Sequence, residues 1–332
     1  MNTLKVLLKR EWLEWQRVVI GTVIVITFLN FLMLLTVARG SSWFHETLDR
    51  DGSIKMKDVQ ISDEDVFDLE IHQNDGELEF YVEGENTTAD VDAFLDQAAK
   101  PVIYGMRFGM QGIFLFVLFL SLFYFSDAIY KERADNSTLF FRSLPVDDHM
   151  LLGSKIGAGL LGVIGLTLFL SLEYLLFVRV AFMIWGDPLN SMVSAVFSRV
   201  SYIGIIWDWF SYLLYAAIRM APLALFLMLV GAFVKGRPLL IGIGGPILAA
   251  ISWSILFKSA ALFKFIGKFF WGFNIVLIEQ WQELSPKWHT EELVYANPWD
   301  YIFNIDTLGA LLASAVLYYV LWTVYRKNVP TG

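Results

Sequence analysis

Two charged residues, Glu173 and Arg219, lie inside long apolar runs of the chain. An ionised side chain costs about 2.5–3.5 kcal/mol at the centre of a membrane-inserted helix, so each residue needs a partner or water. One interpretation is an ion pair between them that lines or locks a pathway. The other is that Arg219 extends its guanidinium to the lipid headgroups while Glu173 meets water by itself. The sequence leaves both interpretations open.

Other chemistry is largely excluded by what the chain lacks. It has no cysteine, and its four histidines, which are His45, His72, His149 and His289, show no metal-ligand spacing. It also has no Gly-x-x-x-x-Gly-Lys-Ser/Thr phosphate loop. We therefore expect no enzyme activity, no metal and no cofactor in this chain, and nothing in it predicts a nucleic-acid partner. Any ATP-driven step needs ATP and Mg on another polypeptide.

One glycine motif has a structural explanation. Residues 157–162 spell Gly-x-Gly-x-x-Gly, but no strand precedes them and no acidic residue follows at the distance that a dinucleotide site requires. The pairs Gly153/Gly157 and Gly162/Gly165 instead predict a ridge of small residues for close helix packing.

Apolar runs predict an all-α polytopic membrane protein. Hydrophobic residues make up 56% of the 332 residues and charged residues only 17%, well below the usual quarter in soluble domains. A helix crosses a bilayer core with about 17–25 apolar residues. Six runs are long enough: Val18–Ala38, Phe108–Ile129, Ile156–Val178, Leu213–Val234, Leu239–Phe257 and Thr307–Val324.

Basic residues predict the orientation. With the N-terminus inside, the cytosolic pieces are 1–17, 130–155, 235–238 and 325–332, and they carry 12 Lys and Arg in 55 residues. The outer pieces, 39–105, 179–212 and 258–306, carry 11 in 150 residues. This threefold difference in density follows the positive-inside rule, so we expect a multi-pass plasma-membrane protein with both termini in the cytoplasm.

The segment before the first span, residues 1–17, has the pattern of an amphipathic helix. Leu4, Leu7, Leu8, Trp12 and Trp15 recur at helical spacing, and Lys5, Lys9, Arg10, Glu11 and Glu14 occupy the other face. This pattern predicts a helix that lies in the membrane interface before span 1 begins at residue 18. It serves either as a plain anchor or as an elbow that supports a docked partner.

Between spans 1 and 2, residues 39–105 predict a small acidic α+β domain outside the membrane. Residues 41–105 contain 17 acidic and four basic residues, a net charge of −13. Apolar residues alternate over 67–71 and again over 78–82, with Asn74-Asp75-Gly76 between them, which predicts a β-hairpin. Thr88 is placed to cap a short helix through Ala99. The acidic surface either keeps the domain soluble or attracts a cationic substrate.

The charged connection between spans 2 and 3, residues 130–155, is the most informative part of the chain. A connecting loop does not need exposed apolar residues, whereas a loop that docks on another protein does. Asp135 or Asn136 can cap a short helix, Pro145 ends it, and Asp147 can cap span 3. The residues assigned to docking are Glu132, Arg133, Asp135, Thr138, Leu139, Phe140, Phe141, Arg142, Leu144 and Pro145. The alternative is that the aromatic pair only enters the headgroup region.

This loop resembles that of the type-2 permease family of ATP-binding cassette (ABC) transporters. The similar pattern is Glu132-Arg133, an acidic residue at 135, Thr138-Leu139, then 143–146 reading Ser-Leu-Pro-Val, and a later Lys155. It covers residues 125–156, and Ser137 stands where the family usually has Gly. The resemblance implies a cytosolic coupling helix that fits a groove on an ABC ATPase subunit. It also implies two ATPase copies and a second permease chain, identical or homologous.

The outer segment, residues 258–306, is not expected to cross the membrane. It is rich in Trp and has two lysines inside an apolar run, so we expect a re-entrant or interfacial element rather than a seventh crossing, and the family resemblance implies the same. The domain 106–332 thus holds spans 2–6, the loop and this segment. Together these features predict a permease subunit of an ABC exporter in the bacterial inner membrane, surrounded by lipid. The alternative is a membrane-embedded scaffold of the cell envelope without transport activity.

Overall fold

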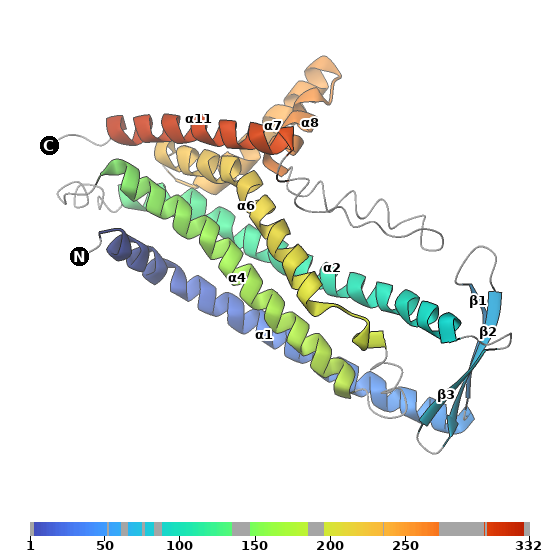
Figure 1. Ribbon diagram of the computed structural model, residues 1–332. Helices are drawn as coiled ribbons and strands as arrows, with labels where there is room; N and C mark the ends of the chain where they lie inside the picture. The colour runs from blue at the N-terminus through green and yellow to red at the C-terminus, as the bar shows by residue number, and fades with distance from the viewer. Residues whose placement is uncertain are drawn as a thin grey trace.

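The computed structural model describes residues 3–51, 53–60, 66–74, 77–82, 88–134, 147–184, 196–234, 236–271, 302 and 304–328. Long helices dominate these residues (Figure 1). They are α1 (Thr3–Asp51), α2 (Thr88–Ala134), α4 (Asp148–Ile184), α6 (Tyr202–Phe233), α7 (Pro238–Phe257), α8 (Ala261–Trp271) and α11 (Ile305–Asn328). Three strands, β1 (Ser53–Gln60), β2 (Val66–Asn74) and β3 (Glu77–Val82), lie between α1 and α2.

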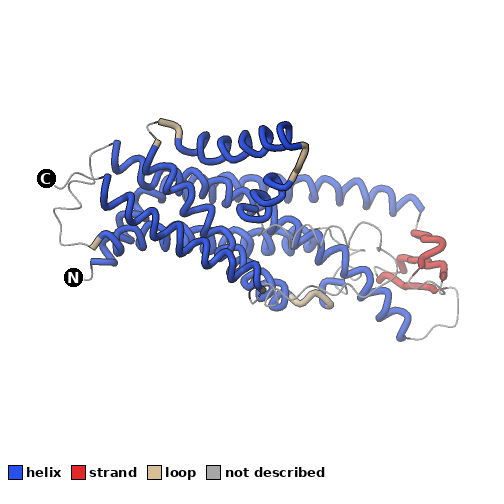
Figure 2. Tube along the Cα trace, turned by 90° about the horizontal axis from the view of Figure 1, so that it is seen from above, coloured by secondary structure: helices blue, strands red, loops and turns tan. Residues whose placement is uncertain are grey.

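Six of the described helices are long and apolar enough to cross a membrane: α1, α2, α4, α6, α7 and α11. Each contains one of the six predicted spans almost entirely, so the prediction of a multi-pass helical membrane protein is confirmed. Both chain termini lie at the same end of the bundle, which we call the termini end, and the sheet lies beyond the opposite end (Figures 1 and 2).

The N-terminal segment is not a separate helix. Residues 3–51 form one helix, because no proline interrupts the backbone hydrogen bonds where residue 17 meets the first span. Leu7 and Glu11 are buried and Trp12 is 56% exposed. This helix packs against α4, and its side chains Arg10 and Glu11 also contact α2. Its predicted position in the membrane interface stays a prediction.

The strands form an antiparallel sheet in the order β1-β2-β3. Strand β2 pairs with β3 so that Asn74 lies opposite Glu77, which leaves residues 75 and 76 as a two-residue connection. The helix predicted over 88–99 does not end there. Its residues are the first turns of α2, which runs from Thr88 to Ala134, so Pro101 directly after the predicted segment does not end the helix.

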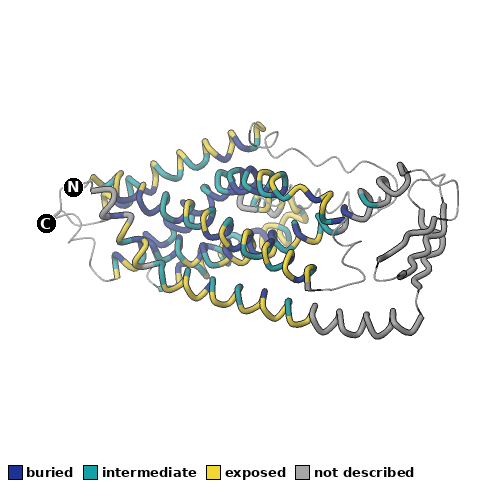
Figure 3. The backbone as a smooth tube through the Cα atoms, turned by 60° about the horizontal axis from the view of Figure 1, so that its bottom comes forward, coloured by how far each residue is buried: buried dark blue, intermediate teal, exposed yellow. Residues whose placement is uncertain are grey.

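Helices α2, α4 and α6 form the packed centre, with α11 against α6 and α1 against α4. Figure 3 shows buried residues where helices face one another inside the bundle and exposed residues on its outer faces. The predicted glycine ridge does not make these contacts, since no atom lies within 4 Å of a Cβ added at Gly153, Gly157, Gly162 or Gly165. Close approach occurs elsewhere. A Cβ at Gly159 would meet Phe125, and one at Gly231 would meet the Ser126 carbonyl oxygen.

The last part of the bundle is less buried. Helix α7 is largely exposed and ends at Lys258, which adopts a left-handed conformation with φ 48°. Helix α8 follows and has 11 residues, about 16 Å at the usual rise, so it is too short to cross a bilayer core of about 30 Å. Most of the remaining predicted outer segment, 272–301, lies outside the described residues.

Candidate functional site: a buried ion-pair network at the start of the 135–146 loop

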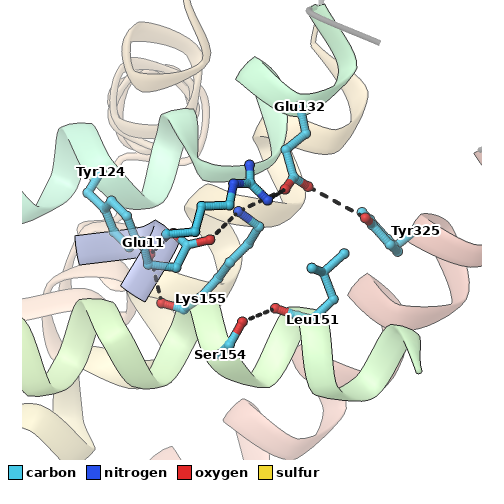
Figure 4. Close-up of polar contacts among 8 residues, drawn as sticks. Glu11, Tyr124, Glu132, Leu151, Ser154, Lys155 and Tyr325 are labelled. Atoms are coloured by element: carbon cyan, nitrogen blue, oxygen red, sulfur yellow. Dashed lines mark hydrogen bonds and ion pairs between the residues drawn. The ribbon is translucent and has the colours of Figure 1, made fainter. Parts of the chain in front are cut away.

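Four helix ends meet at the termini end of the bundle, next to where α2 leads into residues 135–146, which we call the central loop. Helix α1 contributes Glu11, α2 contributes Glu132, α4 contributes Lys155 and α11 contributes Tyr325 (Figure 4). The side chains of Glu11, Glu132 and Lys155 are each no more than 3% exposed. Three buried charged side chains from α1, α2 and α4 and one tyrosine hydroxyl from α11 therefore meet in one cluster.

Lys155 is the centre of this network. Its ammonium nitrogen Nζ lies 3.0 Å from Glu11 Oε1 and 3.1 Å from Glu132 Oε1. An ammonium group has three donors and no acceptor, so two carboxylates suit it well. Leu151 lies one turn earlier on α4 and is also buried, which places Lys155 on the face that packs into the bundle.

Tyr124 connects the same elements a second time. Its hydroxyl donates to Glu11 Oε2 at 2.9 Å and also lies 3.1 Å from the carbonyl oxygen of Lys155. The ring of Trp15 packs edge-on against Tyr124, with centroids 4.7 Å apart. Both oxygens of Glu11 are therefore engaged, and this carboxylate fixes the N-terminal part of α1 to α2 and α4.

Two further residues complete the network around Glu132. Arg10 Nη1 lies 3.3 Å from Glu132 Oε1, and the Tyr325 hydroxyl donates to Glu132 Oε2 at 3.5 Å. Two carboxylates and two cations balance, so the formal charge of the group is zero. This balance is necessary, because an uncompensated charge in such a buried position costs several kcal/mol.

The structure describes two of the residues assigned to ATPase coupling, Glu132 and Arg133. Glu132 is buried in the network, and Arg133 Nη1 donates to the backbone carbonyl of Ala232 at the end of α6. Both side chains bind the helices around the start of the central loop, and their predicted role in coupling stays a prediction. The other eight docking residues lie outside the described residues; they are Asp135, Thr138, Leu139, Phe140, Phe141, Arg142, Leu144 and Pro145.

At the other end of the loop the predicted cap agrees with the geometry. The carbonyl oxygen of Asp147 accepts hydrogen bonds from the backbone of Met150 and Leu151, and α4 begins at Asp148. An acidic residue in the first turn is favourable against the helix dipole.

The two intramembrane charges do not form a pair. Arg219 is 5% exposed, and its Nη1 donates to the carbonyl oxygen of Asp306 at 2.6 Å, in the first turn of α11. Glu173 lies on α4, and its Oε2 is buried without a hydrogen-bond partner. The described residues also contain no group of three or more His, Cys, Asp or Glu side chains that could hold a metal ion.

Sequence reasoning missed most of the network. Lys155 entered only as part of a family pattern, and Arg10 and Glu11 were assigned to the charged face of an interfacial helix. The available signal was the position of Lys155 directly before a strongly apolar run, where its charge requires a partner. No protein-family model, no curated protein and no solved structure matches this chain.

Proposed function

We propose that this chain is the permease subunit of an ATP-driven ABC transporter of the type-2 class, an exporter that a separate ATPase subunit drives through the central loop. The observation that carries the proposal is the network at the start of that loop. A loop with the sequence of a coupling element emerges from a helix end that is fastened to α1, α4, α6 and α11. Six apolar helices are consistent with a transmembrane pathway.

The network gives this proposal a mechanism. In this proposal, an ATPase docked on residues 138–145 would displace the end of α2 when it changes conformation. Since Glu132 is bound to Lys155 and Arg10, α4 and α1 would move together with the end of α2. In the proposed transporter, ATP binding and hydrolysis on two such subunits would move these helices as rigid bodies and alternate the access of the pathway. A second permease chain would supply the other half of the pathway.

The experiment is recovery of the ATPase with the tagged chain. The chain is purified from its native membranes in mild detergent, co-purifying proteins are identified by mass spectrometry, and ATP hydrolysis is measured. Replacing Phe140 and Phe141 together by alanine should leave the chain inserted but weaken ATPase binding about 10- to 30-fold, the effect of losing a central aromatic contact.

A matched control is available on α2. Phe119 and Phe123 form a ring pair with centroids 5.2 Å apart, and both are about half exposed. Their double alanine variant should retain the ATPase. If the wild-type chain recovers no nucleotide-hydrolysing protein, transport driven by a partner is wrong and the scaffold function is favoured. Equal recovery from the Phe140/Phe141 variant would refute docking by the loop.

A further inference from the structure

The two ends of the central loop are both held by the last helix of the chain. Before the loop, Glu132 on α2 accepts a hydrogen bond from Tyr325 on α11. After the loop, His149 in the first turn of α4 stacks on Trp322 of the same helix, with ring centroids 4.6 Å apart and planes inclined by 19°. Segments far apart in sequence thus meet on one short stretch of α11.

A third aromatic residue completes this contact. The Tyr318 hydroxyl lies 3.1 Å from His149 Nδ1, and the two rings are stacked at 6.0 Å. Tyr318, Trp322 and Tyr325 are spaced by four and three residues, so they lie on one face of α11. The guanidinium carbon of Arg326 lies over the Trp322 ring, 5.7 Å from its centroid.

The position of α11 in the bundle gives this contact its significance. Helix α11 packs mainly against α6 and meets α4 only over a short stretch. At its start, the carbonyl oxygen of Asp306 is bound by Arg219 of α6. From Asp306 to Trp322 is 16 residues, about 24 Å of uninterrupted helix. The loop ends are therefore joined to α6 through one rigid element.

We propose that Tyr318, Trp322 and Tyr325 are positioning residues that hold Glu132 and His149, which flank the central loop, at a fixed separation from each other. This inference rests on the proposed function, because it assigns α11 a role in presenting the coupling loop. The aromatic residues act through Glu132 and His149 and do not themselves touch the partner.

The experiment measures the accessibility of a residue in the central loop and does not need the ATPase. Since the chain has no cysteine, Ser137→Cys provides a single reporter thiol in the loop of the full chain in lipid nanodiscs. Trp322→Ala should raise its rate of maleimide labelling about three- to tenfold, the range expected from losing an aromatic stack. His149→Ala should give a similar rise, and combining the two should add little. Trp322→Phe keeps a stacking ring and should stay within about twofold of the parent.

The control is Trp253→Ala on α7, which removes a ring that packs on Phe257 and is 41% exposed. It should leave the labelling rate unchanged while lowering thermal stability to a similar extent. His149 is exposed, so His149→Ala remains informative even if Trp322→Ala fails to fold.

Unchanged labelling in His149→Ala, or an equal rise in Trp253→Ala, would overturn the inference. ATPase recovery with the same variants separates the two proposals. A loop that responds to α11 while no ATPase binds even the wild type would leave the positioning role intact and remove the proposed function.

Discussion

Lys155→Met tests whether the ion-pair network holds the bundle together. Methionine matches the lysine side chain as far as Cε but lacks the ammonium group, which leaves Glu11 and Glu132 buried with less compensation. Breaking a buried ion pair by removing one partner costs about 3–5 kcal/mol. With Lys155 almost fully buried, we expect a loss of this size in the free energy of unfolding.

The same substitution one residue from Glu132 is the control. Lys131 pairs with Asp127 at 3.3 Å, but its side chain is 66% exposed, and such a pair one helical turn apart is worth about 0.3–0.5 kcal/mol. Lys131→Met should therefore change stability by less than about 0.5 kcal/mol. The two variants have identical chemistry and differ in burial and partners.

The assay is equilibrium unfolding of the chain in micelles or bicelles, followed by its tryptophan fluorescence. A double-mutant cycle identifies the partner. Glu11→Gln alone and Lys155→Met alone should each destabilise, and the double variant should lose less than their sum by about 0.5–3 kcal/mol. Equal stability of the Lys155 and Lys131 variants, or strict additivity in the cycle, would refute the view that Lys155 and Glu11 act as one unit.

Three further predictions concern packing, orientation and the intramembrane charges. Gly231→Ala should destabilise by about 1–3 kcal/mol in the same unfolding assay, because the added methyl would press on a backbone carbonyl of α2. In intact cells, an impermeant maleimide should label Gly76→Cys from outside and Ser137→Cys only after permeabilisation, as expected from the distribution of basic residues. Glu173→Gln and Arg219→Gln should have additive effects on stability, because Arg219 binds a backbone carbonyl of α11 and does not meet Glu173.

A specific result would contradict each of these three predictions. Gly162→Ala has open space around the new methyl, so equal losses at Gly162 and Gly231 would show that the close contact is not responsible. Labelling of Trp281→Cys only after permeabilisation would favour a seventh crossing in the 258–306 segment. A coupling energy above about 0.5 kcal/mol between Glu173 and Arg219 would restore the ion-pair interpretation.

The membrane helices were predictable because their signal is local. A run of about twenty apolar residues identifies a span whatever surrounds it, and each of the six runs lies within one of the helices, apart from Val234 directly after α6. The paired register of β2 and β3 likewise follows from alternation around Asn74-Asp75-Gly76. What local signals could not give was where α1 and α2 stop. Both continue beyond their apolar parts. No proline interrupts residues 3–51, whereas α2 continues through Pro101, a residue type that usually kinks or ends a helix.

The network was not predictable because it depends on which helices are neighbours. From periodicity alone, the charged residues of residues 1–17 belong on the solvent side. Glu11 is buried only because Lys155 and Tyr124, more than 100 residues away in sequence, lie opposite it. The same holds for Glu132, whose partners come from α1, α4 and α11. Charge pairing across helices is a tertiary property, and a single sequence gives each charge without its partner.

The choice of charges over apolar residues at this position also follows from physical chemistry. A well-packed apolar cluster of the same volume is often as stable as a buried ion pair or more so, so stability alone does not require Lys155, Glu11 and Glu132. A shift between helices costs more free energy when it separates buried charges than when it rearranges apolar contacts. Sliding α4 by one turn against α1 would separate Nζ from both carboxylates, whereas leucines would find new contacts. The network therefore allows only one register of α1, α2 and α4 at the start of the central loop. If this loop transmits movement, its base needs such a single register, because a base that slips would absorb the movement that it should pass on.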